Sequence, residues 1–374
     1  EMCIRDSYSF RAKFHTKPNF KITIGGNVSS TAFNQAYIGV NYQTIGRVGQ
    51  QLGADLYLGP IYTWGTIGGR TDFYMWKPVF LDYSYNFAVR NFRHGSFGNI
   101  TKIDNTRQVK NSESFFSVAA GMPLAHRGVF LIRANGGHVN YRYDSDELFA
   151  DDTDHSRYSF FGIKAELARN TLDKFLYPRR GSDLKLSGIF VTGRDKYEPF
   201  DAEKFLSRTS RQWVGARLTW DKYFDMPGCS WFSLGLNVDG VITNHPEFTT
   251  EGATVMSMPA YEPVPHAQMI YMPDFRGKRF AAGGVMPTFD LMPNFFLRTG
   301  FYAMFREKRS FVPGVSGPVE DKRWHYIAEA SLVYHTPIGP VSLALTKYDL
   351  RNWKNMYLTF NFGYAIFAPK GTFY

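Results

Sequence analysis

The sequence lacks long hydrophobic runs, and this absence excludes one class of membrane protein. No stretch of the 374 residues approaches the roughly 18 consecutive apolar residues that a membrane-spanning helix needs. Few windows have the period of a long amphipathic helix. The chain is therefore not a helical membrane protein, whereas a protein that crosses the bilayer with β-strands remains compatible with the sequence.

Cysteines and metal-binding patterns are scarce as well. The two cysteines, Cys3 and Cys229, are too few for a disulfide framework. The nine histidines are scattered, and none lies in a pattern with the spacing of a metal site. The acidic stretch 151–155 has the residue types of a calcium site, but a solvated loop is the preferred interpretation. We therefore expect no metal and no cofactor.

Motifs for catalysis and for nucleic-acid binding are also missing. The sequence has no Gly-rich phosphate loop and no Gly-x-Ser-x-Gly nucleophile turn, so we expect no catalytic residues and no enzyme activity in this chain. Lysine and arginine number 43 against 33 acids, which gives a net charge of +10. These cations are spread along the chain without a basic stripe, so a nucleic-acid partner is not expected.

The sequence does contain a repeated period of two. In the segment Tyr357–Phe367, large apolar residues alternate with small or polar ones, as in a β-strand with one apolar face. The pattern recurs from about residue 19 to the end, and most repeats have an aromatic-rich apolar face. Lipid outside a barrel and a polar lumen inside it produce this pattern. The expected environment is therefore the lipid bilayer of a bacterial outer membrane.

The alternating segments number sixteen, and an even number is typical of bacterial barrels. We predict an all-β fold, a 16-stranded antiparallel transmembrane β-barrel. The longest loop, between Thr243 and Phe280, has about 35 residues, and loops of that length are usually functional or disordered. The predicted strands are Phe20–Ser29, Ala36–Tyr42, Leu52–Leu58, Ile67–Trp76, Phe80–Phe92, Ser114–Pro123, Val129–Tyr143, Tyr158–Leu167, Ser182–Thr192, Arg211–Phe224, Trp231–Thr243, Phe280–Leu291, Phe295–Phe305, His325–His335, Pro340–Tyr348 and Tyr357–Phe367.

The first residues fit neither a signal peptide nor the strand pattern. Residues 1–7 (EMCIRDS) resemble a translated sequencing-adapter remnant, which would make Cys3 foreign to the natural protein. Residues 8–18 are interpreted as a linker left from a missing upstream region, and residues 19–374 as the outer-membrane barrel. Any export signal is expected in that upstream region.

Three short motifs, in this order along the chain, resemble signatures of the BamA/TamA-type outer-membrane barrel superfamily, also called the bacterial surface antigen family. Each motif is short, so the resemblance rests on their joint occurrence with matching strand counts. The motifs are Tyr177, Pro178 and Gly181 in the turn before a strand, Phe275, Arg276 and Gly277 in the long loop, and the turn Thr336–Pro340 before the penultimate strand.

The resemblance implies that the long loop folds back into the lumen and that Arg276 pairs there with an acid on the barrel wall. The family usually places that acid on the thirteenth strand, where this chain has Met304. Glu329 and Asp239 are therefore the predicted substitute partners of Arg276. The alternative interpretation leaves Arg276 in a solvated loop and pairs Glu329 with Arg298 or Arg306 across the wall.

The resemblance also implies a weak lateral seam where the first and last strands meet. An exposed strand edge can template an incoming strand, so the implied partner is a protein substrate, with lipoprotein accessory subunits as further partners. Glycines in the middle of the first strand weaken packing there. The predicted seam residues are Ile22, Ile24, Gly25 and Gly26 on the first strand and Phe360, Phe362 and Tyr364 on the last.

Two other functions remain open from the sequence. Residues 25–30 (GGNVSS) and 33–37 (FNQAY) resemble, more narrowly, barrels of Bacteroidetes that follow a patatin-like phospholipase domain. The barrel would then anchor or export an upstream domain of its own chain, and the complete gene would encode the lipase motifs. The other alternative is a passive porin, which needs a loop that narrows the lumen without closing it.

Overall fold

The computed structural model describes residues 19–30, 34–46, 48–74, 76–93, 108–125, 127–144, 153–198, 207–226, 228–229, 231–307, 323–350, 356–364 and 366–373. The predicted adapter remnant and linker, residues 1–18, lie outside the described residues. Residues 151 and 152 of the acidic stretch lie outside them too.

Sixteen strands occur in the described part of the chain, and each corresponds to one of the predicted segments. The first eight are β1 (Phe20–Ser29), β2 (Gln35–Ile45), β3 (Gly49–Leu58), β4 (Tyr62–Tyr74), β5 (Pro78–Arg93), β6 (Gln108–Leu124), β7 (Gly128–Asp144) and β8 (Thr153–Asn170). The second eight are β9 (Gly181–Glu198), β10 (Ser207–Asp225), β11 (Phe232–Thr243), β12 (Arg279–Met292), β13 (Phe295–Arg306), β14 (Trp324–Thr336), β15 (Gly339–Tyr348) and β16 (Met356–Gly363).

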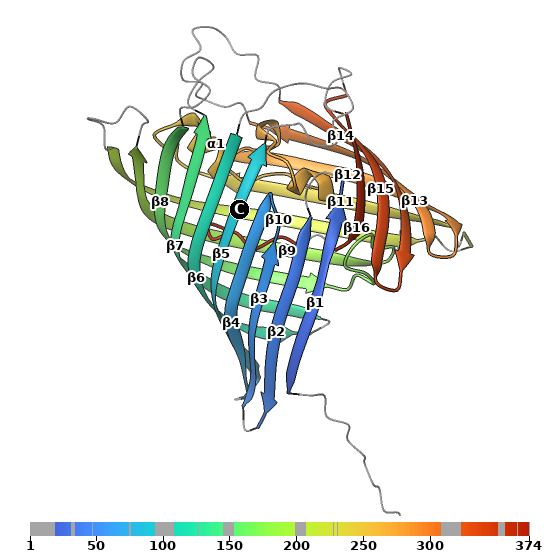
Figure 1. Cartoon of the computed structure of the whole chain (residues 1–374), viewed down its shortest axis with the longest axis horizontal. Helices are drawn as coiled ribbons and strands as arrows, with labels where there is room; N and C mark the ends of the chain where they lie inside the picture. The colour runs from blue at the N-terminus through green and yellow to red at the C-terminus, as the bar shows by residue number, and fades with distance from the viewer. Residues whose placement is uncertain are drawn as a thin grey trace, which may run out of the picture.

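The strands form one closed antiparallel barrel in which each strand pairs with its neighbours in sequence and β1 meets β16 (Figure 1). The predicted 16-stranded barrel is therefore confirmed. The wall is uneven in height, because β10 has 19 residues whereas β16 has 8. A tilted strand needs only about 9–11 residues to cross a bilayer, so the longest strands extend beyond it.

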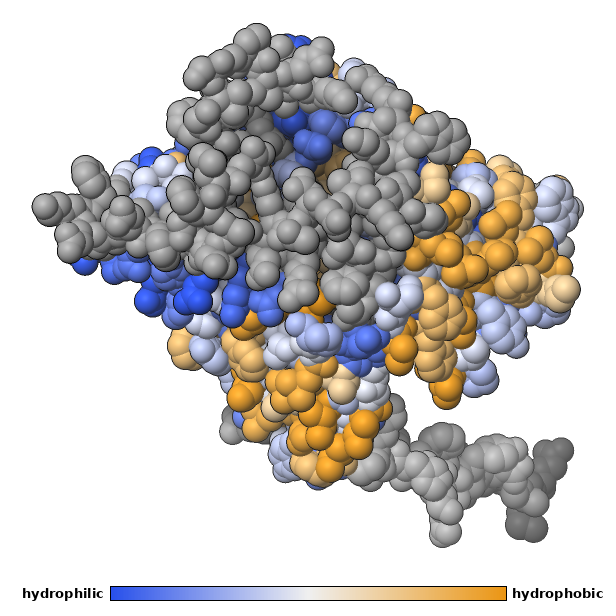
Figure 2. All heavy atoms as spheres, turned by 45° about the horizontal axis from the view of Figure 1, so that its top comes forward, coloured by the Kyte–Doolittle hydropathy of each residue, from blue (hydrophilic) through white to orange (hydrophobic). Residues whose placement is uncertain are grey.

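The outer wall is apolar, as the period of two predicted. On β1, Ile22 and Ile24 are exposed, and on β16 the exposed Leu358 and Phe360 alternate with buried Tyr357 and Thr359. Figure 2 shows hydrophobic residues gathered on the outside of the barrel. Among the described residues, no helix is long and apolar enough to cross a membrane.

The lumen is filled mainly by the long loop, residues 244–278, between β11 and β12. The loop contains α1 (Glu251–Ser257) and two short 3-10 helices, η1 (Pro265–Gln268) and η2 (Pro273–Phe275). Thr250 caps α1 by accepting a hydrogen bond from the Ala253 amide (3.4 Å). Apolar residues of the loop belong to the same buried cluster as inward-facing residues of the wall, and α1 contacts β7. The predicted folding of this loop into the lumen is confirmed.

The last predicted strand is too long at its end. We expected it to continue to Phe367, but β16 ends at Gly363, whose φ is +97°. This left-handed conformation breaks the ladder and turns the chain inward. The segment that follows, residues 364 and 366–373, enters the lumen, where its backbone bonds to side chains of β4 and β6. We call this segment the tail, and the long loop and the tail together the plug.

Candidate functional site

The seam between β1 and β16 is the shortest strand interface of the described barrel. It consists of three residue pairs, Asn27 with Gly363, Val28 with Phe362 and Ser29 with Asn361. One further backbone hydrogen bond runs from the Ser30 amide to the Phe360 carbonyl (2.9 Å). The side-chain pairs of three positions are worth roughly 1–3 kcal/mol in all. The seam is therefore the least paired strand interface of the described barrel.

The predicted seam residues divide into two groups. Phe362 lies opposite Val28, and Phe360 bonds to Ser30 through both its carbonyl and its amide. The four predicted residues of β1 instead pair with β2 and have no partner on β16, because β16 ends before it reaches them. Tyr364 lies beyond the strand, with its ring 6.4 Å from that of Phe175. The described part of β1 thus presents an edge from Phe20 to Gly26 that β16 does not cover.

A cavity of about 330 Å³ lies beside this seam. Its lining joins β1 and β16 at Asn27 and Asn361 to the plug at Pro265 and Met269. Tyr177 lines it from the turn between β8 and β9. Space for side chains therefore exists directly inside the seam.

Gly363 is required where the chain leaves the seam for the lumen. A Cβ at this position would lie 2.5 Å from the Gly26 carbonyl oxygen, and φ is unfavourable for other residues.

We expect Gly363→Ala to lower the free energy of unfolding by about 1–3 kcal/mol, because strain and close backbone contact act together. The measurement is urea unfolding of the purified barrel in detergent, followed by tryptophan fluorescence. Gly188→Ala is the matched control, since an added Cβ there meets nothing within 4 Å. Equal stability of the two variants would contradict the assigned role of Gly363.

The turn with the Tyr-Pro motif reaches from β8–β9 to β13 and β14. Tyr177 (φ +53°) and Pro178 are buried, and Tyr177 packs with Phe296 and Val333 on β13 and β14. Gly181 (φ +102°) ends the turn, where a Cβ would lie 2.3 Å from the Thr171 carbonyl oxygen. The motif therefore folds the turn inward against β13 and β14.

Arg276 is buried in the lumen and holds the long loop together. Its Nη1 donates to the carbonyl oxygens of Met256 (3.0 Å) and Met258 (3.2 Å), and its Nη2 lies 3.5 Å from the Glu262 carboxylate. The neighbouring Phe275 is also buried and contacts the rings of His325 and Tyr348 on the wall. Gly277 donates its amide to Pro259 (3.2 Å). The Phe-Arg-Gly motif thus joins the loop to itself and to the wall.

The predicted acid partners of Arg276 are wrong in this structure. Asp239 accepts two hydrogen bonds from Arg217 (3.1 and 2.7 Å), and Glu329 accepts from the hydroxyls of Ser331 and Thr346. Glu262, within the loop, lies beside Arg276 instead, so a wall acid is not needed.

The position of Met304 agrees with this arrangement, because its side chain is fully buried in the apolar cluster that joins loop and wall. The alternative of a solvated Arg276 is wrong as well, since only 7% of Arg276 is exposed. Arg217 links wall to loop in another way, by donating from Nη2 to the Ala260 carbonyl (3.1 Å).

The tail crosses the lumen and binds the wall opposite β16. Trp64 Nε1 donates to the Ile366 carbonyl (3.1 Å), and the Ala368 amide donates to the Tyr62 hydroxyl (2.7 Å). Gly371 donates its amide to Glu113 (3.0 Å) and accepts from Asn135 Nδ2 (2.8 Å). These contacts reach from β4 to β7, so the end of the seam strand is tied to the far side of the barrel.

Glu262 connects the two parts of the plug. Its carboxylate lies 3.5 Å from Arg276 in the loop and 3.9 Å from Lys370 in the tail. Burial alone would raise the pKa of Glu262, but the positive charges of Lys370, Arg276, Arg90 and Arg217 lower the pKa below its usual value. Sequence reasoning missed Glu262 because the partner of Arg276 was expected on the barrel wall, and it missed Lys370 because the chain was expected to stay in the wall as far as Phe367.

No protein-family model and no curated protein matches the sequence. Solved structures do match in fold. BamA from Haemophilus ducreyi lacking POTRA domains 1–3 superposes with a TM-score of 0.63 at 12% identity, covering 92% of this chain and 70% of that one. CdiB from Acinetobacter baumannii superposes with a TM-score of 0.51 at 9% identity over 92% of this chain, which spans only 60% of that CdiB. The chain thus has the fold of a 16-stranded bacterial outer-membrane barrel similar to BamA.

Proposed function

We propose that this barrel inserts protein substrates into the outer membrane through the β1–β16 seam. The single observation that carries the proposal is the seam itself, three residue pairs long and next to an edge of β1 that β16 does not cover. An incoming strand can pair with that edge through its backbone, which is β-strand addition. The adjacent cavity of about 330 Å³ offers room for its inward-facing side chains.

Because the lumen is filled, we favour the seam rather than the lumen as the route of the protein substrate. The loop enters the lumen from β11 and β12 and the tail enters it from β16, and both share buried contacts with the wall. A passive porin needs a continuous water path, and a substrate exported through the lumen would have to displace both parts of the plug. A substrate that enters the membrane through the seam requires neither a continuous water path nor displacement of the plug. The resemblance to the BamA/TamA-type superfamily agrees with this choice.

A disulfide across the seam tests the proposal. Ser29→Cys and Asn361→Cys place thiols on directly opposed residues, whose Cα atoms in an antiparallel pair are about 4.5–5.5 Å apart and within disulfide range. With the two existing cysteines replaced by serine, we expect oxidation to abolish insertion of an unfolded barrel protein into liposomes that contain this protein. Dithiothreitol should restore insertion, which protease protection of the substrate measures.

The matched control shares one of the two positions. Ser342→Cys with Asn361→Cys joins β15 to β16, which are already paired from Val341 to Lys347. Insertion should then be the same in oxidised and reduced protein. If the oxidised seam variant were as active as this control, lateral opening would be rejected and export through the lumen would be favoured.

The upstream region and the accessory lipoproteins remain predictions. Sequencing the source DNA upstream of Tyr8 tests the prediction about the upstream region. POTRA modules alone would agree with an assembly barrel, whereas a Gly-x-Ser-x-Gly nucleophile turn would make this barrel the carrier of a lipolytic domain.

A further inference from the structure

The inner wall of the barrel holds the tail through the main chain of the tail. Four hydrogen bonds join the tail to β4, β6 and β7, and each connects a wall side chain to a main-chain atom of the tail. Trp64 and Asn135 donate to carbonyl oxygens, whereas Tyr62 and Glu113 accept from amides. Every residue except proline offers the same two main-chain groups. The wall therefore recognises the path of a peptide more than its side chains.

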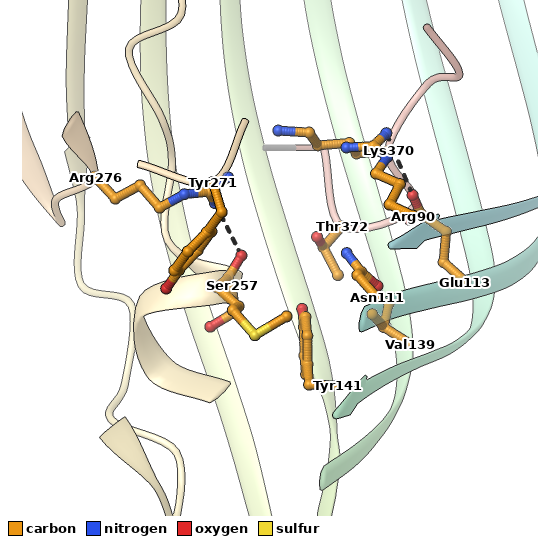
Figure 3. Close-up of a pocket in the computed structure, with 11 residues that line it drawn as sticks. Arg90, Asn111, Glu113, Val139, Tyr141, Ser257, Tyr271, Arg276, Lys370 and Thr372 are labelled. Carbon is orange, nitrogen blue, oxygen red and sulfur yellow. Dashed lines mark hydrogen bonds and ion pairs between the residues drawn. The ribbon is translucent and has the colours of Figure 1, made fainter. Parts of the chain in front are cut away.

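The wall itself orients two of these groups. Arg90 of β5 donates to the Tyr62 hydroxyl (3.2 Å) and lies 3.8 Å from the Glu113 carboxylate. Figure 3 shows Arg90 and Glu113 beside Lys370 and Thr372 of the tail, with the loop on the other side of a small cavity. The polar groups that bind the tail are thus held by contacts within the wall.

Two aromatic side chains of the tail fit against the wall. The ring of Phe367 stacks on that of Tyr62, with the ring centroids 5.8 Å apart. The ring of Phe373 lies over Gly162 of β8, where an added Cβ would come within 2.9 Å of this ring. A hydrogen bond from the Phe373 amide to the Lys370 carbonyl (3.2 Å) closes a turn at this end of the tail. The wall thus accommodates two aromatic side chains on either side of this turn.

The position between the two aromatic residues is restricted to glycine. A Cβ on Gly371 would lie 2.7 Å from the Phe160 ring and 2.9 Å from the Phe115 ring. The preceding Lys370 lies 3.9 Å from the Glu262 carboxylate of the loop. The site therefore favours the pattern aromatic-x-x-Lys-Gly-x-aromatic, and the main chain supplies the hydrogen bonds.

We propose that the inner wall of β4–β8 is a binding site for peptide segments of this pattern, and that the tail is its exchangeable ligand. A segment of another polypeptide with the same pattern makes the same main-chain hydrogen bonds and replaces the tail. The tail competes with such a segment through its attachment to β16, because a short tether gives an effective concentration in roughly the millimolar range. The proposal concerns the lumen and does not rest on the function of the seam.

Peptide binding to the whole chain in detergent tests the proposal. The probe is a fluorescein-labelled peptide with the sequence of residues 366–374 (IFAPKGTFY), and its fluorescence anisotropy reports binding. Gly371→Val prevents the tail of the protein from docking, because the added side chain meets the two phenylalanine rings, and it leaves the wall unchanged. We expect saturable binding to this variant and on the order of tenfold weaker binding to the unmodified protein, where the attached tail competes.

Pro369→Ala is the matched control variant. The side chain of Pro369 is exposed, so the tail of this variant should still dock. The variant should bind the peptide as weakly as the unmodified protein does. Circular dichroism must show the same β-content in all three proteins.

Peptides with one ester bond test whether the main chain is recognised. An ester in place of the Gly371 amide removes the N–H that donates to Glu113. The affinity for the Gly371→Val protein should then fall roughly tenfold, as expected for the loss of a hydrogen bond to a carboxylate. An ester at Thr372 is the control and should leave the affinity unchanged, because the Thr372 amide makes no hydrogen bond within the described part of the chain.

A photocrosslink locates the bound peptide. Benzoylphenylalanine in place of Phe367 of the peptide should crosslink to β4, where the Tyr62 ring lies. The same crosslink should form in the unmodified protein at higher peptide concentration, so this readout does not depend on a variant. Crosslinks to other strands, no saturable binding to the Gly371→Val protein, or equal binding to the unmodified protein would overturn the proposal.

Discussion

Removing both parts of the plug is expected to convert a closed barrel into an open pore. The single-channel conductance in planar bilayers should rise on the order of tenfold, since unplugged barrels of 16 to 18 strands hold an aqueous channel. β11 and β12 are paired as far as Ile242 and Arg279, so a short Asn-Gly turn can replace residues 245–276. Truncation after Gly363 removes the tail but leaves β16 complete.

The two single deletions serve as controls for the double deletion. The loop alone and the tail alone each still occupy part of the lumen, so each single deletion should give a smaller and less steady conductance. Circular dichroism must show the same β-content in all variants. If the unmodified barrel conducts as strongly as the double deletion, the lumen is already open in the membrane, and the porin alternative becomes the better explanation.

Replacing Arg276 is expected to destabilise the protein more than Gly363→Ala does. Arg276→Met leaves the carbonyl oxygens of Met256 and Met258 without this donor and removes one of the two nearest cations from Glu262. Breaking a buried ion pair by removing one partner costs about 3–5 kcal/mol of stability. The midpoint of urea unfolding in detergent, followed by tryptophan fluorescence, measures this loss.

Arg180→Met is the matched control for that substitution. Its ion pair with Asp225 (3.5 Å) is exposed, and exposed pairs are worth at most about 1 kcal/mol. Arg276→Lys should fall between the two, because lysine keeps the charge but lacks the fork that reaches the loop carbonyls and Glu262 together. Similar stability of the Arg276→Met and Arg180→Met variants would show that the loop does not rely on this arginine.

Such a result for Arg276 would bear on the plug and leave the seam proposal intact. The seam is supported by the pairing of β1 with β16, to which Arg276 makes no contact. A loosened plug would nevertheless affect the seam, because the tail connects the two. Lys370 and Glu262 join the tail to the loop, and the tail continues directly from Gly363.

Much of the fold could be predicted because its determinants are local. A period of two assigns alternate residues such as Phe360 and Thr359 to opposite faces, and this depends only on strand geometry. The inward folding of the long loop was implied by the resemblance carried by Phe275, Arg276 and Gly277. The length of the seam was not predicted, because it depends on where two strands distant in sequence stop pairing.

The sixteen strands, their outward faces and the position of the long loop follow from local sequence patterns alone. The partner of Arg276 depends on the three-dimensional fold, since a charge selects its partner by distance in space, and Glu262 lies nearer than the wall acids Asp239 and Glu329. The course of the tail likewise depends on contacts in the fold that the sequence pattern does not reveal. Residues 364–367 continue the alternation of a strand, yet the φ of Gly363 and the hydrogen bonds that β4 forms with the tail turn the chain into the lumen.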